Sequence, residues 1–415
     1  MELAVWLAGA CVATLVERRR RMTMTYSTDA GPPGVPLVSM SMPVSTGRFP
    51  DRVVRAFFHG LLPEGDVRRI LAYDLGIDPS DDIGLLAALG GDCAGALLVQ
   101  PAFGPVPVGS VLEDLLIDDA EVGRRLLDLP VHPLGVDQRI RVSLAGVQPK
   151  LLLCRRPDGR WLLPSLRYAS THILKPAHRD LPDSVANEAF CMNLAAAAGL
   201  PAAHTTTGTF AGFDVLVSER YDRRVQENGD VVRVHQEDAC QALSVLTVIP
   251  ERKYEEFGGP SLSEIAGQLD RWSGAAGKGA LLGQVAFSCL VGNADMHGKN
   301  VSFLHDGKGT VALAPLYDVM STAYYTAIGR QIDPTPGLFV NAKRHIDQVT
   351  LNDLVDEAEH WGMRPRNARS LLSELLERLP DAVDETARNL PKTPGALVDL
   401  VKDRVERMRS QRRTP

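Results

Sequence analysis

The sequence lacks paired cysteines. Its six cysteines are scattered over 415 residues without a CxxC pair, and the nearest two in sequence, Cys154 and Cys191, are 37 residues apart. Neither a disulfide scaffold nor a cysteine zinc site is expected, because both need closely spaced or regularly paired thiols. Thiols dispersed among mostly apolar neighbours are typical of reduced core residues, which predicts a cytoplasmic protein.

The chain also lacks a basic excess and a long apolar run. Its net charge of −6 argues against a dedicated nucleic-acid-binding protein. The apolar stretch at 3–16 is shorter than the roughly 20 residues of a membrane span. Glu2 precedes this stretch and the arginines at 18–21 follow it, the reverse of a secretory signal. We therefore expect no membrane association, and predict a β-strand that runs into an arginine-bearing turn and resumes at 22–27.

No internal repeat is present. The chain is longer than a single hydrophobic core usually accommodates, so two or three domains are expected. The apolar spacing at 52–65 predicts a helix, and residues 82–101 predict a helix, a glycine break and a strand. The Pro- and Gly-rich stretch at 101–109 predicts a linker. The first domain should therefore end near residue 104.

The middle of the chain is rich in strand signals and the remainder in helix signals. Strands are predicted within 144–156, 171–177 and 212–223, and a helix over 184–200. This helix should have Asp183 or Ser184 as its N-cap and Gly199 as its stop. From about residue 235 onward the chain is predicted to be mainly helical, starting with a helix at 235–240. The pattern favours an α+β, bilobal layout with domains at 1–104, 105–234 and 235–415.

The stretch VGNADMHGKN at 291–300 crowds polar groups at the end of a helix that is predicted to be buried. Glycine and asparagine alone would fit a turn, but Asp295 and Asn300 lie five residues apart with Lys299 beside the asparagine. Asp318 follows a further apolar stretch. Phosphoryl transfer needs an Asp at the attacking hydroxyl, then an Asn and a second Asp that hold magnesium on the phosphates. Protein kinases use the same spacing and order, so the motif predicts phosphoryl transfer.

The strand-rich segment supplies candidates for a nucleotide site. The loop after Val142 carries small residues and ends at Lys150, and such a loop can offer backbone N–H groups to phosphate. Lys175 ends an apolar strand, the position of the nucleotide-pairing lysine of kinases, although a solubilising lysine on an edge strand is the alternative. Glu188 on the next helix could orient Lys175 or could be a solvated helix charge. Residues 219–221 are predicted to connect the lobes and to meet the adenine.

These residues resemble the HipA family of serine/threonine kinases, the toxin components of HipBA-type toxin–antitoxin systems. The matching segments run in order along the chain as far as about residue 325: FFHGLLPEG (57–65), GGDCAGAL (90–97), SLAGVQPKL (143–151), THILKP (171–176), NEAFCMNLA (187–195), ERYDR (219–223), HQEDACQAL (235–243), GNADMHGKN (292–300) and YDVMST (317–322). The family has a small N-terminal domain and a kinase-like body, which agrees with the layout expected from the sequence.

The resemblance implies a role for each matching residue. Asp295 would be the catalytic base, Asn300 and Asp318 would bind Mg²⁺, Glu188 would support Lys175, and Ser143 would be autophosphorylated. The residues expected to contact ATP are Ser143, Ala145, Gly146, Val147, Gln148, Lys150, Lys175, Glu219, Arg220, Tyr221, His297 and Lys299. His297 could be mistaken for part of a catalytic triad, but no nucleophile accompanies it, and a structural hydrogen bond is expected. The segment 235–240 is expected to support the site structurally.

Three functions remain open at this point. The first is an ATP-dependent protein kinase toxin, restrained by a HipB-like helix-turn-helix antitoxin and bound to DNA only through it. Its substrate would be a translation component such as an aminoacyl-tRNA synthetase, as the resemblance implies. The second is a catalytically weak nucleotide-binding co-regulator of a repressor. The third is a kinase of a small molecule or lipid headgroup.

Overall fold

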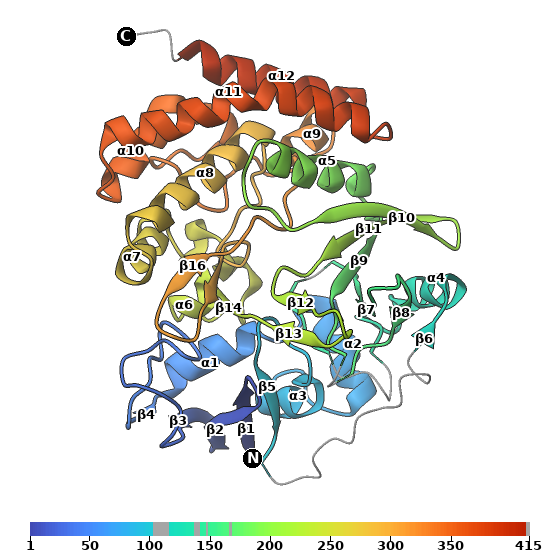
Figure 1. Ribbon diagram of the computed structural model, residues 1–415, viewed down its shortest axis with the longest axis vertical. Coiled ribbons are helices and arrows are strands. Elements are labelled where there is room, and N and C mark those ends of the chain that lie inside the picture. Colours follow the sequence, from blue (N-terminus) through green and yellow to red (C-terminus); the bar gives the residue numbers. More distant parts are fainter. Residues whose placement is uncertain (103–115, 137–141, 147, 166–167, 412–415) are drawn as a thin grey trace. The chain divides into compact units, whose positions relative to one another are not determined.

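The computed structural model of the chain describes residues 1–102, 116–136, 142–146, 148–165 and 168–411 (Figure 1). Most of the predicted linker at 101–109 lies outside these residues. The chain forms two compact units. Unit 1 contains Met1–Pro176, Gly208–Pro250 and Leu304–Thr310, and unit 2 contains Ala177–Thr207, Glu251–Phe303 and Val311–Pro415.

Unit 1 begins with an antiparallel sheet in the order β4-β3-β2-β1-β5. Its strands are β1 (Glu2–Leu7), β2 (Ala10–Arg18), β3 (Arg21–Tyr26), β4 (Arg48–Phe49) and β5 (Leu98–Pro101). The single strand expected over 3–16 is wrong, because the chain reverses at Ala8 and Gly9, which both have positive φ. The arginine turn is a second reversal, where Arg18 pairs with Arg21.

Three helices complete this first sheet region: α1 (Asp51–Gly60), α2 (Gly65–Leu75) and α3 (Asp82–Leu89). The predicted helix at 52–65 is confirmed as α1, whose apolar stripe places Phe57 and Phe58 in the core with no exposed surface. The predicted helix, glycine break and strand at 82–101 are confirmed as α3 and β5. Burial of these large apolar faces stabilises the layer, at about 25 cal/mol per Å² removed from water.

The second sheet of unit 1 has the order β10-β11-β9-β7-β8-β6. Its elements are β6 (Leu116–Ile117), α4 (Asp119–Asp128), β7 (Leu151–Arg155), β8 (Trp161–Leu162), β9 (His172–Pro176), β10 (Thr205–Phe210) and β11 (Phe213–Glu219). Strand β9 lies between β11 and β7, with Lys175 opposite Leu216. The chain passes from unit 2 to unit 1 within β10.

The last part of unit 1 contains β12 (Arg223–Val225), β13 (Val231–Arg233), β14 (His235–Asp238) and α6 (Ala239–Ala242). The helix expected from residue 235 is wrong over its first turn, which is a strand of four buried polar residues. The Glu237 carboxylate accepts hydrogen bonds from Ser39 Oγ (2.6 Å) and Met40 N (2.7 Å), so tertiary partners stabilise this extended backbone. Asp238 does cap a helix, as N-cap of α6 in a capping box with Gln241.

Unit 2 is mainly helical and is built around a buried helix, α8. Its helices are α5 (Ser184–Ala197), α7 (Leu262–Trp272), α8 (Ala275–Val291), α9 (Thr322–Ala327), α10 (Leu351–His360), α11 (Pro365–Asn389) and α12 (Gly395–Ser410), with 3₁₀ turns at Pro250–Lys253, Glu255–Phe257 and Ile346–Gln348. Helix α8 packs against α7, α10, α11 and α12, as the upper part of Figure 1 shows. Two strands follow α8: β15 (Ser302–His305), whose last two residues belong to unit 1, and β16 (Val311–Leu313).

The predicted helix at 184–200 is confirmed as α5, with Asp183 as its N-cap. Asp183 has a left-handed φ of 57° and its side chain makes no capping hydrogen bond, and Gly199 with φ 83° follows the end of the helix. Among the described residues, no helix is long and apolar enough to cross a membrane. Mixed helices and sheets of this kind are the predicted α+β class.

Candidate functional site

The loop that follows α8 holds the predicted catalytic residues. Gly292 is the C-cap of helix α8. It adopts φ 71°, and its backbone N–H donates to the Ser288 and Cys289 carbonyls of the last helical turn. The backbone N–H of Asp295 donates to Asn293 Oδ1 at 3.0 Å, and Asn300 Nδ2 donates to the Asp295 carbonyl at 3.0 Å. Asn300 N also donates to the His297 carbonyl at 2.8 Å. The loop is therefore closed on itself, and its polar residues fix its shape.

The Asp295 side chain is solvent-exposed and accepts a hydrogen bond from Tyr254 Oη at 2.7 Å. The surrounding protein still desolvates the carboxylate, so burial raises its pKa, and the charge of Asp318 raises it further. The Tyr254 hydroxyl and the Lys253 ammonium act in the opposite direction. An open carboxylate with a raised pKa is suited to receive a proton from a hydroxyl group.

Residues distant in sequence support the loop within unit 2. Gly298 N donates to the Lys253 carbonyl at 2.9 Å, and Gly337 N donates to the Ala294 carbonyl at 2.7 Å. A Cβ atom at Gly337 would lie 2.6 Å from the Met296 carbonyl oxygen, so only glycine fits there. Sequence analysis missed Tyr254, Lys253 and Gly337, because no motif spacing connects them with residue 295.

Asp318 lies at a sharp bend and is exposed, with φ 58°. Its neighbour Tyr317 donates from its hydroxyl to the Lys299 carbonyl at 2.6 Å, and the same hydroxyl lies 2.6 Å from Ser302 Oγ. Tyr317 therefore ties the Asp318 bend to the residue that precedes Asn300.

A second tie holds the same bend from α5. Asn187 Nδ2 donates to the Ser321 carbonyl at 3.0 Å, and Ser321 N donates to Asn187 Oδ1 at 2.8 Å. All of these residues belong to unit 2, so unit 2 by itself brings Asp295, Asn300 and Asp318 into one arrangement.

This arrangement fits a hard cation that binds oxygen. Because Asn300 Nδ2 donates to the Asp295 carbonyl, the other amide atom, Oδ1, is the oxygen that Asn300 can offer to an ion. Asp318 supplies an exposed carboxylate. Over the described part of the chain, no group of three or more His, Cys, Asp or Glu side chains could hold a metal. Mg²⁺ suits such a site, since it usually takes one or two protein oxygens and completes its shell with water and phosphate.

The other predicted residues of this unit are buried. His297 packs edge-on against Tyr254 with ring centroids 5.0 Å apart, and burial lowers its pKa well below the usual range. Its Nδ1 has no hydrogen-bond partner in the described residues. Lys299 and Glu188 are also buried, on the loop and on α5.

Unit 1 holds the predicted phosphate loop, residues 142–150, of which Val147 lies outside the described residues. Ser143 is fully buried, and its Oγ donates to the Leu61 carbonyl at 2.7 Å. Lys150 Nζ donates to the Ala145 carbonyl at 3.3 Å. Gly146 has φ 110°, and a Cβ there would lie 2.6 Å from Lys150 Nζ, so glycine permits this close approach. Gln148 is half-buried.

Lys175 is buried on β9, which is an internal strand of its sheet. This position excludes the edge-strand alternative for Lys175. Glu219 ends β11 and is exposed, with its carboxylate 3.9 Å from His172 Nε2.

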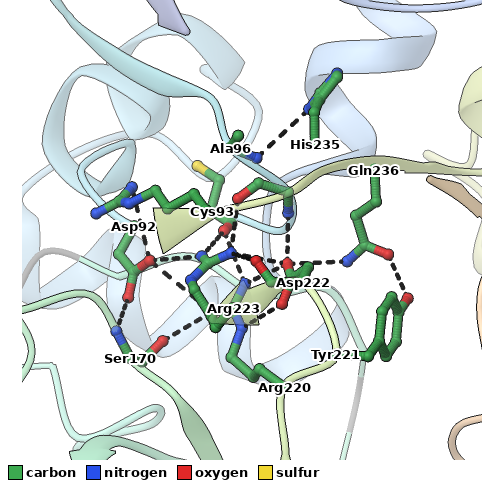
Figure 2. Close-up of polar contacts among 12 residues, drawn as sticks. Asp92, Cys93, Ala96, Ser170, Arg220, Tyr221, Asp222, Arg223, His235 and Gln236 are labelled. Atoms are coloured by element: carbon green, nitrogen blue, oxygen red, sulfur yellow. Dashed lines mark hydrogen bonds and ion pairs between the residues drawn. The ribbon is translucent and has the colours of Figure 1, made fainter. Parts of the chain in front are cut away.

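The Arg220 side chain is buried, and the half-buried Tyr221 directs its hydroxyl toward Gln236 (Figure 2). Arg220 binds Asp222 through Nε (3.0 Å) and Nη2 (2.8 Å), and Tyr221 donates to Gln236 Oε1. The Arg220 side chain is therefore engaged in a buried ionic network, and only its backbone remains for a nucleotide.

Family models match the chain in two successive blocks. Residues 3–100 match the HipA N-terminal domain, and residues 142–383 match the HipA-like C-terminal domain. A putative kinase, Y4mE, of Sinorhizobium fredii is 39% identical over 372 residues, which are 88% of this chain and 85% of that protein.

Two further comparisons concern Shewanella oneidensis. Its serine/threonine-protein kinase toxin HipA is 30% identical over 384 residues, covering 88% of this chain and 84% of the toxin. A solved structure of the toxin–antitoxin system HipA, HipB and operator DNA matches with a TM-score of 0.83 at 26% identity. That match covers 99% of this chain and 96% of the solved one.

Proposed function

The chain belongs to the HipA family of kinase toxins, and from this premise we propose that it is an ATP-dependent protein serine/threonine kinase. The observation that carries the proposal is the exposed Asp295 carboxylate, held by Tyr254 in a loop that also fixes Asn300. The α+β fold and the order of the motifs along the chain support the same activity.

Asp295 acts as the general base in this proposal. The oxygen of a substrate hydroxyl attacks the γ-phosphorus of ATP, the bond to the β-phosphate oxygen breaks, and ADP leaves. The hydroxyl proton passes to the Asp295 carboxylate, whose raised pKa favours its uptake. Asn300 Oδ1 and Asp318 would hold Mg²⁺, which would neutralise phosphate charge when bound.

Unit 1 contributes the nucleotide-binding groups. Backbone groups of the phosphate loop and the ammonium groups of Lys150 and Lys175 meet the phosphates, and the backbone of 219–221 meets the adenine. Gly146 supports the first assignment, because its positive φ is a conformation found where a backbone approaches a ligand closely. The family resemblance alone keeps His297, Lys299 and Glu188 in the proposed set.

The cellular role that we propose is growth arrest, with a HipB-like helix-turn-helix antitoxin as the restraining partner. The solved structure of HipA with HipB and operator DNA supports this choice of partner. The family resemblance suggests a translation component, such as an aminoacyl-tRNA synthetase, as substrate. DNA is bound only through the antitoxin, since a net charge of −6 disfavours strong contacts with a polyanion. Tight operator binding by the purified chain alone, measured at physiological salt, would contradict this.

Ser143 is proposed as an autophosphorylation site that switches the kinase off. A phosphate there adds about −1.5 to −2 charges beside groups that should meet ATP phosphates, so ATP affinity falls. One molecule modifies another, since the same loop cannot both cradle ATP and receive its phosphate. Mass spectrometry after incubation with ATP and Mg²⁺ tests the site: an unmodified Ser143, in protein that phosphorylates other substrates, would contradict the switch.

The kinase assignment is tested by comparing phosphoproteomes of cells that express the wild-type chain or its Asp295→Asn variant. Serine or threonine phosphosites that appear only with the wild-type chain support a protein kinase and identify its substrate. Identical phosphoproteomes from equally abundant proteins would contradict it and favour the co-regulator or small-molecule kinase.

A further inference from the structure

A buried ionic cluster in unit 1 lies between the two family-matched blocks of the chain, and the proposed catalytic scheme does not use it. Figure 2 shows its members around Asp92 and Cys93, and we call residues 91–95 the clasp loop. The cluster joins Asp92 of the HipA N-terminal domain to Arg220, Asp222 and Arg223 of the HipA-like C-terminal domain. Each of these four side chains is at most 3% exposed.

The clasp loop is bound to the C-terminal domain through both side chain and backbone. Arg223 Nη2 donates to Asp92 Oδ1 (2.8 Å), and Ser170 N donates to Asp92 Oδ2 (2.8 Å). The Cys93 carbonyl accepts from Arg220 Nη2 (2.9 Å) and Arg223 Nη2 (2.8 Å). Charge-assisted bonds of this kind, shielded from water, give a rigid connection.

Two further bonds fix the far end of the loop. Gly95 N donates to Asp222 Oδ2 (2.7 Å), and the Gly95 carbonyl accepts from Arg223 Nη1 (2.8 Å). Gly95 has φ 74°, and a Cβ there would lie 2.7 Å from Gln236 N, so the loop approaches the neighbouring backbone too closely for a side chain.

The same loop holds the start of the phosphate loop. Ser143 N donates to the Asp92 carbonyl at 2.9 Å, and Ser143 Oγ donates to the Leu61 carbonyl at 2.7 Å. Both acceptors belong to the N-terminal domain. Ser143 is fully buried, so its hydroxyl can react only after both bonds break.

We propose that Asp92 is a positioning residue for the phosphate loop. Its carboxylate, held by Arg223 and the Ser170 amide, fixes the clasp loop. The backbone carbonyl of Asp92, together with that of Leu61, then keeps Ser143 buried. The N-terminal domain thereby controls both the shape of the phosphate loop and the access of Ser143 to phosphorylation. The positioning role itself does not depend on the proposed function. Only the expected changes in ATP affinity and in Ser143 phosphorylation rest on it.

The test uses Asp92→Asn in the full chain and a matched control, Asp82→Asn. Asp82 is a buried carboxylate of the same domain that binds Arg55 (3.0 Å), Arg68 (2.7 Å) and the His59 ring (2.9 Å), all outside the clasp loop. In the single variant Arg223 keeps Asp222 as an ionic partner at 3.0 Å. A double variant, Asp92→Asn/Arg223→Met, also deletes the Arg223 bonds to the Cys93 and Gly95 carbonyls, so the single variant tests Asp92 and the double variant tests the clasp as a whole. Hydrogen exchange of the Ser143 amide is measured without nucleotide.

We expect the Ser143 amide to exchange at least tenfold faster in both Asp92 variants than in the wild type or Asp82→Asn. At saturating ATP, Ser143 should also be phosphorylated faster in the Asp92 variants, and KM for ATP should rise about tenfold with kcat within a factor of three. Exchange as slow as in the wild type, or equal acceleration by Asp82→Asn, overturns the proposal.

The wild-type chain distinguishes failure of the clasp from failure of the nucleotide assignment. If ATP and Mg²⁺ leave exchange of the phosphate-loop amides unchanged, the proposed nucleotide role of the loop is wrong. The clasp is then judged by the nucleotide-free exchange alone, which needs neither ATP binding nor catalysis.

Discussion

In unit 1 the carboxylates of Asp92 and Asp222 are buried and bound by arginine, whereas in unit 2 Asp295 and Asp318 are exposed and held through their neighbours. Arginine charges overcome burial and lower the pKa of both Asp92 and Asp222. At Asp295 the Tyr254 hydrogen bond and the Lys253 charge do not overcome desolvation, so its pKa is raised. In unit 1 the carboxylates use their charge to hold the backbone in place. In unit 2 neutral side chains such as Tyr317 and Asn187 hold the backbone, which leaves the charges of Asp295 and Asp318 available for chemistry.

The largest expected effect separates catalysis from nucleotide binding. Asp295→Asn should reduce phosphoryl transfer by roughly 10²–10⁴-fold while ATP affinity is retained, because only the proton acceptor is lost. Transfer from radiolabelled ATP and equilibrium nucleotide binding measure the two quantities. Asp356→Asn, the same change on an exposed position of α10, should leave both unchanged. Wild-type transfer rates in Asp295→Asn would show that the catalytic assignment is wrong.

A smaller effect tests the metal ligand in unit 2. Asp318→Asn should weaken Mg²⁺-dependent ATP binding about tenfold or more, since a charged oxygen ligand is replaced by a neutral one. Asparagine is chosen because it tolerates the φ of 58° at this bend, whereas alanine would add backbone strain. Binding titrated against Mg²⁺ concentration gives the result. An unchanged dependence on Mg²⁺ would exclude Asp318 as a ligand.

The next prediction concerns the hydrogen bond from Tyr254 to Asp295. This bond stabilises the charged carboxylate, so Tyr254→Phe should raise the pKa of Asp295 further. The acid limb of the pH–rate profile then moves to higher pH, so the rate falls more at pH 6 than at pH 8. Tyr73→Phe, at an 85% exposed position, is the control. Equal loss at both pH values would contradict the electrostatic role.

The smallest expected effect is on stability. Burial raises the pKa of Glu255 to about 7, so the folded chain binds this proton more tightly than the unfolded chain does. Stability should therefore fall as pH rises from about 4.5 to about 7, the opposite of an ion-paired carboxylate. Glu255→Gln should remove this loss and stabilise unit 2 by about 1–2 kcal/mol at pH 8, with little effect at pH 4.5.

Thermal unfolding across this pH range measures the effect of Glu255→Gln. Its neighbour Glu256 is partly exposed and pairs with Arg344, so Glu256→Gln serves as the matched control and should not flatten the pH dependence. An unchanged pH dependence in Glu255→Gln would assign the effect to other groups.

The fold class and the catalytic loop were predictable because their signals are local. Helix α8, its glycine stop and the spacing of Asp295 and Asn300 all lie within 30 residues. The reversal at Ala8 and Gly9 was missed, since an apolar Ala-Gly pair looks like continuous strand until its positive φ values are known. Strand β14 was mistaken for helix because its polar residues are satisfied by distant partners.

The supporting residues of the site were not predictable for the same reason. Tyr254 and Gly337 reach the catalytic loop only through tertiary folding. Arg220 was assigned to the nucleotide from its place after β11, but its guanidinium binds Asp222 and the Cys93 carbonyl. The burial of Ser143 against Leu61 likewise depends on contacts 82 residues apart.

The buried arginines also limit how the gene can be divided. A fragment that starts at residue 142 would keep Arg220, Arg223 and Asp222 but lose Asp92 and the Cys93 carbonyl, so the two guanidinium groups lose the partners that cover and orient them. The complementary fragment, residues 1–102, would expose an apolar face and a carboxylate without its counter-ions. A chimera that takes its N-terminal segment from a relative should therefore fold only when the aspartate of that segment and the arginines of the C-terminal domain are exchanged together. Soluble expression of the kinase region should likewise require the first hundred residues.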